Sequence, residues 1–324
     1  MGRKLHTYSM QDALILVCAA CDVPEAFFQN PSVALLPVHL RMRSGDLLDK
    51  RLRTATLAFY GTLATQGPSA GYSEPLEVED IASFLRGILL AQPYPVLALL
   101  VAGARSTQVT RMKHAAASLD EPSAAGGRAR VQVVDSGNLL AGYAVQALDL
   151  LDQRTKATDW PSLQRRIARN TERTHAYLVP EGLQFIAHHG KARGDRSTPW
   201  QARVAAALFG FTPILHGHRN QTRMVAKRVG AERTRELLFA KVRAVMRQGR
   251  LTSPHVAVSF GGDLSEVELM PGYQRLLSEG RDHGVTVHLA QMSMANAMNV
   301  GPRALSVGFI AHQDNDASFY SQYD

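Results

Sequence analysis

Apolar strands that alternate with amphipathic helices are the feature that most limits the folds open to this chain. Residues 12–18 (DALILVC), 95–103 (PVLALLVAG) and 130–136 (RVQVVDS) have the length and composition of buried strands. A segment with helical periodicity follows each of them. Strands buried on both faces belong to parallel sheets that helices cover on both sides. The pattern therefore predicts an α/β fold with parallel or mixed sheets flanked by helices.

The same pattern returns, with variations, from about residue 174. Strands are predicted at 174–180, 212–218, 255–260, 285–293 and 304–311. The charged helix at 162–173 separates the two halves, so the chain is expected to form two domains, at 1–172 and 173–312. The polar segment 313–324 has no core pattern and is predicted to be a disordered tail.

The start of the first helix carries a local signal. Asp22 precedes the segment VPEAFF, and Glu25 follows three residues later, which is the spacing of a capping box. We therefore expect Asp22 to cap the N-terminus of this helix.

Cys18 and Cys21 stand in a Cys-x-x-Cys spacing at the end of the first predicted strand. A helix N-terminus lowers the pKa of a nearby thiol, which gives a redox interpretation some physical basis. A structural zinc site needs four ligands, however, and the chain has only two cysteines. Its histidines are expected to be scattered, so no metal site is predicted. Two cysteines cannot build a disulfide framework, and no span or secretory signal is recognised, so a cytoplasmic location is expected.

The net charge of +8 is concentrated in one segment. Residues 151–250 carry 20 Lys and Arg against 7 Asp and Glu, whereas 1–150 carry 13 against 13 and 251–324 carry 3 against 8. Such an excess favours an anionic membrane, nucleic-acid or protein surface, or is a solvated basic face. The residues expected to be exposed on it are Arg165, Arg169, Arg235 and Arg243.

Several motifs, taken in order, resemble those of the DegV fatty-acid-binding proteins. Residues 130–148 (RVQVVDSGNLLAGYAVQAL) are similar to the family's Val-Asp-Ser strand and the Gly-rich start of its helix. Residues 180–192 (PEGLQFIAHHGKA), 211–236 and 300–309 (VGPRALSVGF) resemble three further family elements. The resemblance covers about residues 12 to 311.

The resemblance implies a two-domain α/β protein, without catalytic activity or cofactor of its own, that encloses one long-chain fatty acid. In that family the acyl chain lies in a closed apolar tunnel and the carboxylate lies at the cleft between the domains. It also implies a partner such as a fatty acid kinase, which phosphorylates the bound acid. Transient contact with an anionic membrane surface fits the basic segment.

Matching the family's head-group motifs residue by residue gives a candidate ligand site. The family's Thr-Ser-Gln-Pro loop falls on residues 72–75 with its Ser retained, and its Ser-Gly-Thr turn falls on residues 105–107 with Arg in place of the leading Ser. The residues expected at the ligand are Ser73, Arg105, Ser106, Thr107, Lys191, Arg228, Asn299 and Arg303. The family's Asp-Ser pair at the end of the first strand falls on Cys18 and Ala19, so most head-group contacts differ from the family pattern.

Two alternatives stay open. The altered head-group residues are also consistent with a degenerate paralogue that has lost its ligand and serves as a regulatory or scaffolding subunit. The basic segment is consistent with a nucleic-acid binder, although it lacks interleaved aromatic residues and any recognised motif, so nucleic acid is the less favoured partner.

Overall fold

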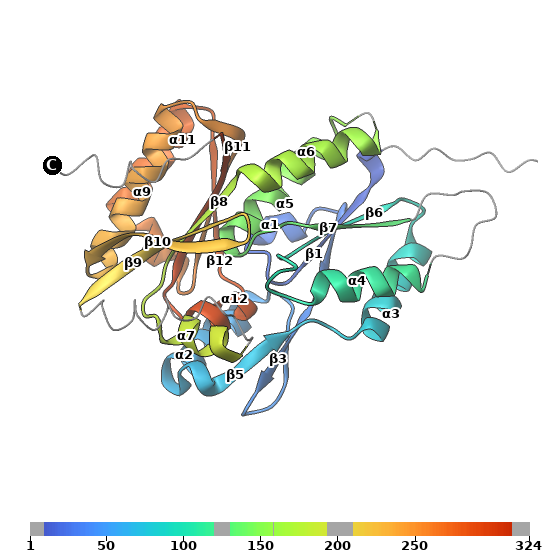
Figure 1. Cartoon of the computed structure of the whole chain (residues 1–324), viewed down its shortest axis with the longest axis horizontal. Helices are drawn as coiled ribbons and strands as arrows, with labels where there is room; N and C mark the ends of the chain where they lie inside the picture. The colour runs from blue at the N-terminus through green and yellow to red at the C-terminus, as the bar shows by residue number, and fades with distance from the viewer. Residues whose placement is uncertain (1–9, 120–129, 158, 193–209, 313–324) are drawn as a thin grey trace, which may run out of the picture.

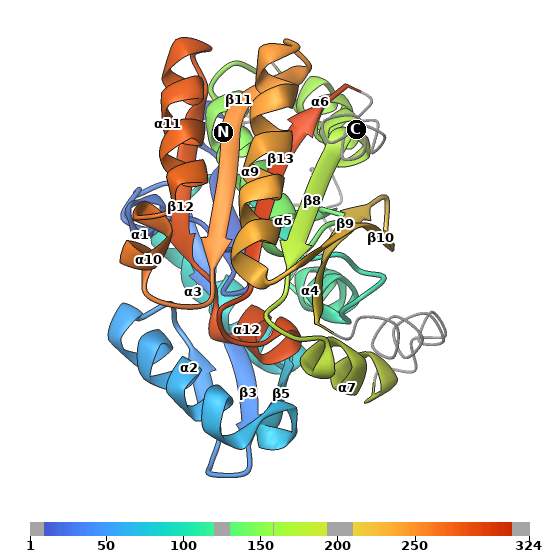
Figure 2. The ribbon, with the colours of Figure 1, turned by 90° about the vertical axis from the view of Figure 1, so that its left-hand side faces the viewer.

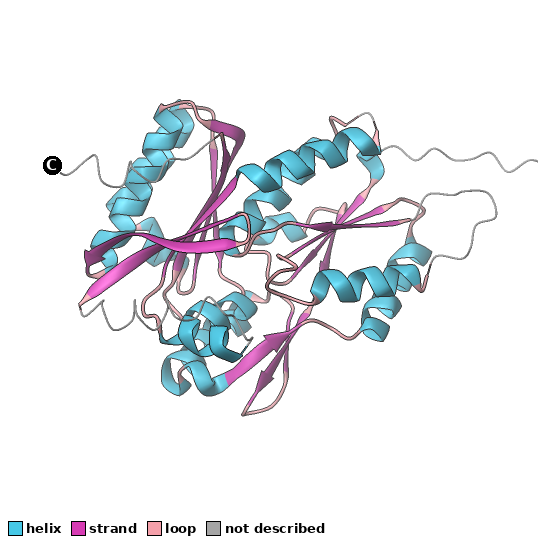
Figure 3. Ribbon diagram, in the orientation of Figure 1, coloured by secondary structure: helices cyan, strands magenta, loops and turns pink. Residues whose placement is uncertain are grey.

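The structure, a computed structural model, describes residues 10–119, 130–157, 159–192 and 210–312. The described chain forms three sheets with helices packed between and around them (Figures 1 and 3). The α/β class, with parallel and mixed sheets flanked by helices, is confirmed. No helix in the described ranges combines the length and the apolar composition that a membrane span requires.

The first sheet is parallel throughout and has the strand order β2-β1-β6-β7. Its strands are β1 (Leu14–Cys18), β2 (Val33–Leu36), β6 (Val96–Leu100) and β7 (Val131–Asp135). The helices around it are α1 (Glu25–Phe28), α3 (Val78–Ala91), α4 (Gln108–Ala117), α5 (Leu140–Arg154) and α6 (Trp160–Arg173). Figure 1 shows α3 and α4 on one side of the sheet and α5 and α6 on the other. This arrangement explains why β6 is buried along its whole length.

A small antiparallel sheet, β4-β3-β5, extends from the first. It consists of β3 (Val38–Met42), β4 (Leu47–Asp49) and β5 (Gly71–Glu74), with α2 (Arg53–Gln66) packed beside it and the short helix η2 (Pro68–Ala70) before β5. The apolar run at 32–42 reads as one strand, but the structure divides it into two strands in different sheets, β2 and β3. Pro37 separates them, because a proline lacks the N–H that a continuous strand would donate.

The third sheet has six strands in the order β10-β9-β8-β13-β11-β12 and is mostly antiparallel, with β11 and β12 parallel. Its strands are β8 (Thr174–Val179), β9 (Phe211–His218), β10 (Gln221–Val229), β11 (Leu251–Phe260), β12 (Thr286–Gln291) and β13 (Leu305–Ala311). Helices α9 (Ala231–Arg247) and α11 (Pro271–Asp282) cover the face seen in Figure 2, and α5 packs against the strands from the other side. Gly308 permits this close approach, since a Cβ there would lie 2.1 Å from the carbonyl oxygen of Ala141.

Strands before β8 belong to the first two sheets and strands from β8 on belong to the six-stranded sheet, but helices from each half pack against the sheets of the other half. Helix α5, from the first half, contacts three strands of the six-stranded sheet. Helix α12 (Met294–Val300), from the second half, packs against α2, β3, β5 and α7 (Gln184–Ala192). One apolar core accordingly runs from Ala13 to Ile310, and a second lies under α9 and α11. The expected tail, 313–324, lies outside the described residues.

The sequence patterns missed several elements, among them β5, one strand of a hairpin and two short helices. The chain forms a β9–β10 hairpin whose turn residues, Arg219 and Asn220, both have positive φ values (49° and 61°), as a two-residue hairpin turn requires. A separate short helix, α10 (Leu264–Glu268), precedes α11, which begins at Pro271, a residue that fits the first helical position. Helix α12 was not predicted, because seven residues carry too little periodicity.

Candidate functional site

Two adjoining cavities lie where the carboxyl ends of β6 and β7 face α12 and the β9–β10 turn. The larger has a volume of about 990 Å³ and the smaller about 160 Å³. They share part of their walls, including Arg105, Asn220 and Asn299. Ligands of open α/β sheets commonly bind beyond the carboxyl ends of the strands, which makes this pair of cavities the candidate site.

The larger cavity is polar on one side because three segments bring hydroxyl, amide and guanidinium groups to it. Ser73 comes from β5, residues 105–107 follow β6, and Asn299 comes from α12. The Asn299 Nδ2 donates to Ser73 Oγ at 3.2 Å and to the carbonyl oxygen of Ala295 at 2.6 Å. Two segments that are 226 residues apart in the sequence therefore meet at this wall.

The turn at residues 105–107 leads directly into α4. The amide N–H of Ser106 donates to the Ala102 carbonyl at 3.1 Å, and the Ser106 Oγ accepts from the Gln108 amide at 3.2 Å. Thr107 occupies the N-cap position without a capping bond from its side chain. The first turn of a helix carries N–H groups without intrahelical partners and a partial positive charge, so this wall favours an anion.

Asp135, at the end of β7, connects the loops that follow β6 and β7. Its Oδ1 accepts from the amide N–H groups of Gly103 at 3.1 Å and Gly137 at 2.8 Å. A Cβ on Gly103 would lie 2.7 Å from the Asp135 Oδ2, so a glycine is needed for this approach. Asp135 thus fixes the loop from which Arg105 reaches both cavities.

The smaller cavity is apolar over most of its wall. The apolar residues lining it include Leu139, Leu140, Ala176, Leu178, Ile186, Leu215 and Val300. They come from the start of α5, from β8 and β9, and from α7 and α12. A hydrocarbon group would be removed from water there, whereas a charged group would lie in the larger cavity.

Comparison with known proteins identifies the family. The sequence model described as "Uncharacterised protein, DegV family" matches residues 13–312. The chain belongs to the DegV family. A DegV domain-containing protein of Xanthomonas campestris pv. campestris is 30% identical over 304 residues, covering 92% of this chain and 96% of that protein. One from Xanthomonas axonopodis pv. citri is 29% identical with the same coverage.

Solved DegV structures share the fold at low sequence identity. A DegV family protein from Thermus thermophilus, described by its fatty-acid binding, has a TM-score of 0.74 at 18% identity over 93% of this chain and 100% of that one. A stearic-acid-binding protein from Eubacterium ventriosum has a TM-score of 0.74 at 14% identity, covering 92% and 98%. The Bacillus subtilis DegV, described as a fatty-acid-binding protein, has a TM-score of 0.71 at 12% identity, covering 93% and 99%.

Of the residues predicted from DegV motifs, Ser73, Arg105, Ser106, Thr107 and Asn299 all line the larger cavity. Three others lie elsewhere or are not described. Lys191 is in α7, whose Gly190 lines the smaller cavity, but the placement of the Lys191 side chain lies outside the described part of the structure.

Arg228 and Arg303 do not line either cavity. Arg228 is on β10 opposite Thr212, at the far end of the hairpin from the turn at Asn220. Arg303 follows α12, where its guanidinium pairs with Glu266 at 2.7 Å and its carbonyl accepts from Arg235. Sequence matching placed both at the head group because the hairpin and the α12–β13 turn were not recognised.

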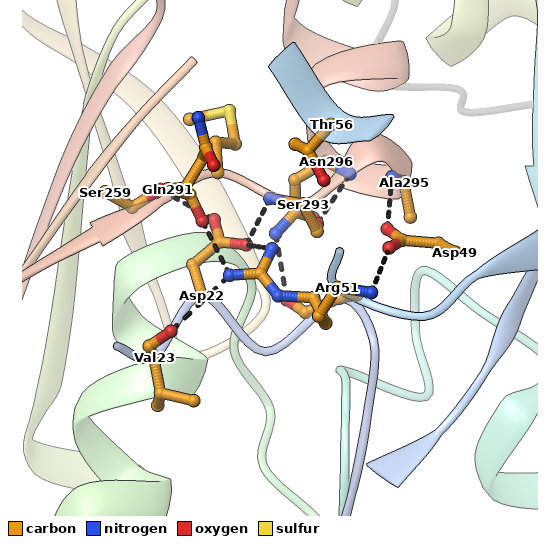
Figure 4. A network of polar contacts seen from close by, with 12 residues as sticks. Asp22, Val23, Asp49, Arg51, Thr56, Ser259, Gln291, Ser293, Ala295 and Asn296 are labelled. Atoms are coloured by element: carbon orange, nitrogen blue, oxygen red, sulfur yellow. Dashed lines mark hydrogen bonds and ion pairs between the residues drawn. The ribbon is translucent and has the colours of Figure 1, made fainter. Parts of the chain in front are cut away.

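A buried polar network in this DegV-family chain was missed altogether (Figure 4). Asp22 accepts from Ser259 Oγ at 2.7 Å and from the Ser293 amide at 2.8 Å, and pairs with Arg51 at 3.5 Å. Asp49 accepts from the amides of Arg51 and Ala295. Burial raises the pKa of both carboxyls, and the Arg51 charge opposes that rise.

The expected capping role of Asp22 is therefore wrong. Helix α1 begins at Glu25 with Pro24 at its N-cap position and no side-chain cap. The Asp22 carboxylate binds the N-terminus of α12 instead, across the molecule. The sequence signal that could have pointed here is the presence of two aspartates and one arginine at or shortly after the ends of β1 and β4.

The two cysteines are core residues. Cys18 and Cys21 are free thiols, both fully buried, and the Cys18 amide donates to the Tyr143 hydroxyl at 3.1 Å. Burial raises the pKa of Cys18 to about 11 and that of Cys21 well above its ordinary value. Burial therefore disfavours the thiolate, which is the form that attacks disulfides and binds metals.

Proposed function

We propose that this chain binds a long-chain fatty acid, with the carboxylate in the larger cavity and the acyl chain entering the smaller one. The observation that carries the proposal is the shared wall between an apolar and a polar cavity. An amphiphile with a single anionic head group fits such a pair. Membership of the DegV family and the fatty-acid-binding descriptions of its structural relatives support the same ligand.

Arg105 is the residue proposed to dominate head-group binding. An ionised carboxylate taken from water is costly unless several donors meet it. A guanidinium on the wall that the two cavities share supplies both charge and paired donors, which a hydroxyl at this position would not. Ser73, Thr107 and Asn299 supply further polar groups on the same wall.

The acyl chain is expected to widen the smaller cavity as it enters. At about 160 Å³ that cavity is close to the size of an engineered apolar cavity that holds benzene, which is smaller than a long acyl chain. Each methylene removed from water contributes about 0.8 kcal/mol, so a chain of a dozen or more carbons offsets the displacement of side chains such as Ile186.

The proposal includes delivery of the bound acid to an acyl-processing enzyme such as a fatty acid kinase. The carboxylate would lie in the wider cavity, where a second protein has room to reach it. Of the basic residues expected to form a docking face, Arg165 and Arg169 are exposed on α6, whereas Arg235 is 4% exposed and pairs with Glu181 at 2.7 Å. An anionic membrane or protein surface would therefore meet α6.

The test of ligand binding compares a fatty acid with its methyl ester in wild type and Arg105→Gln. The wild type should prefer the acid, and Arg105→Gln should lose roughly 2–5 kcal/mol of acid affinity while ester affinity stays the same. Arg86→Gln, which removes an exposed arginine from α3, is the matched control and should bind as wild type does.

Mass spectrometry of an organic extract of the purified protein should show one fatty acid per chain. Equal affinity for acid and ester, with no lipid in the extract, would favour a ligand-free paralogue with a regulatory or scaffolding role. Steep salt-dependent binding to DNA or RNA without lipid would favour the nucleic-acid alternative.

A further inference from the structure

Three histidines that the sequence suggested were scattered meet on the six-stranded sheet. His216 and His218 are two residues apart on β9 and project from the same face. β8 runs antiparallel to β9 with Ala176 opposite Gly217, so His175 lies directly beside them. One ring nitrogen of each histidine lies within 4.8 Å of the others, and the group contains no carboxylate or thiolate among the described residues.

We propose that His175, His216 and His218 form a binding site for one divalent transition metal ion, with Zn²⁺ as the expected ion. Imidazole nitrogen suits Zn²⁺, Cu²⁺ and Ni²⁺, whereas Ca²⁺ and Mg²⁺ prefer oxygen ligands. Three imidazoles leave one coordination position to water or an anion, as in zinc sites with three protein ligands. The proposal does not rest on lipid binding, but His218 also lines the smaller cavity, so the two sites adjoin each other.

Two of the required nitrogens are already at a suitable separation. Nδ1 of His175 and Nε2 of His216 are 3.0 Å apart. Two nitrogens bound to one zinc ion at about 2.0–2.1 Å lie roughly 3.4 Å apart when the coordination is tetrahedral. A metal ion would replace the proton that these two nitrogens now share.

The orientation of His218 is set by a contact typical of metal-bound histidines. Its Nδ1 lies 2.9 Å from the carbonyl oxygen of Thr174, the residue before His175. A ligating imidazole commonly donates its second N–H to a backbone carbonyl, which fixes the tautomer and leaves the other nitrogen for the metal. The Thr174 hydroxyl in turn donates to the Asn170 carbonyl of α6 at 2.6 Å, so the start of β8, which carries this carbonyl, is itself held.

Metal binding requires the rings to turn. The His175 and His218 rings are stacked with centroids 4.4 Å apart and an angle of 1°, and His175 also stacks on His216. A metal ion lies in the plane of each imidazole that binds it, so parallel rings cannot share one ion. His218 is the half-buried member at the edge of the stack, whereas His175 and His216 are 3% and 2% exposed, so His218 has the most room to rotate. Its contact with the Thr174 carbonyl would have to adjust as the ring turns.

Two arginines limit the affinity that we expect. Arg219 and Arg223 lie close enough to His218 to repel a positive charge on its ring, and they repel a metal cation in the same way. The site should therefore bind zinc less tightly than a closed structural site with thiolate ligands. Salt should raise the zinc affinity, because it screens this repulsion.

The test uses the full chain without an affinity tag, treated with a chelator and then titrated with Zn²⁺ at micromolar concentration. One Zn²⁺ per chain is expected, and its binding should raise the melting temperature. His218→Asn should lower the affinity by at least about tenfold, since even groups that only orient a metal ligand change affinity by 10–100-fold. His288→Asn is the matched control, because it removes a partly buried histidine of the same sheet that also contacts another imidazole.

Co²⁺ gives a second measurement on the wild type that does not rely on any variant. Its absorption spectrum should show d–d bands of a nitrogen- and oxygen-coordinated ion without the charge-transfer band of a Co–thiolate bond. Zinc uptake well below one ion per chain, wild-type affinity in His218→Asn, or a thiolate band that assigns the metal to Cys18 and Cys21 would each overturn the proposal.

Discussion

Two polar regions connect the first half of the chain to α12, and they differ in what surrounds them. The Asp22–Arg51 network at the start of α12 is closed: Asp22 and Asp49 are fully buried, and Arg51 donates to the Gln291 carbonyl at 2.6 Å. The Ser73–Asn299 contact, at the end of the same helix, borders an open cavity of about 990 Å³. The closed network fixes α12, and the fixed helix presents Asn299 to the cavity.

The difference has an electrostatic reason. Asp22 and Asp49 both accept from backbone N–H groups at the N-terminus of α12, which otherwise have no partner. Buried carboxylates are retained only when such donors and a cation surround them. Around the cavity the polar side chains are less buried, so water can occupy the space that a ligand would fill. We infer that mutations in the network reduce stability and mutations at the cavity reduce binding.

The largest expected effect is that of Arg51→Met. Removal of the arginine leaves Asp22 and Asp49 as buried carboxylates without their cation, which costs about 3–5 kcal/mol in comparable pairs. Urea unfolding measures the loss. Arg53→Met, at an exposed position at the start of α2, is the control and should cost under about 0.5 kcal/mol. Similar stability in both variants would show that the network does not anchor α12.

Ser73→Ala should have a smaller effect, on ligand binding alone. Loss of one hydroxyl that hydrogen-bonds a carboxylate costs roughly 1–2 kcal/mol of affinity. The free energy of unfolding should stay close to that of the wild type, because Ser73 is only partly buried and Asn299, which donates to it, also donates to the Ala295 carbonyl. Fatty-acid titration and urea unfolding of the same preparation check both parts, and a loss of stability without a loss of affinity would contradict the comparison.

A third expected effect concerns acid pH and is confined to it. Burial, together with the neighbouring His255, lowers the pKa of His288 to about 4. An unfolded histidine has a pKa near 6.5, so the unfolded state binds the proton first and stability falls as the pH drops from about 6.5 to 4. His288→Asn should flatten the stability profile in this window. If the stability profile of His288→Asn matches that of the wild type, His288 is not the source of the acid sensitivity.

Motif matching predicted much of the cavity wall but little of the network. Ser73, the turn at residues 105–107 and Asn299 could be placed because each belongs to a short segment with a family counterpart. Arg228 and Arg303 could not, because their positions depend on a hairpin and a turn that local periodicity did not reveal. Asp22 matched a local capping pattern, yet its hydrogen-bond donors, Ser259 and Ser293, lie 237 and 271 residues away in the sequence.

The sequence by itself determined the alternation of strands and helices and the parallel character of the first sheet, because buried positions recur along the chain with the period of each element. It also determined the family, through short motifs in a fixed order. Only the tertiary structure decided which buried polar groups meet. In the structure Asp22 accepts a hydrogen bond from the N-terminus of α12, and Arg235 is buried and pairs with Glu181. Three histidines meet on two neighbouring strands, although His175 and His216 are 41 residues apart in the chain. Pairing of this kind depends on how helices and strands pack across the whole molecule, and no local pattern encodes it.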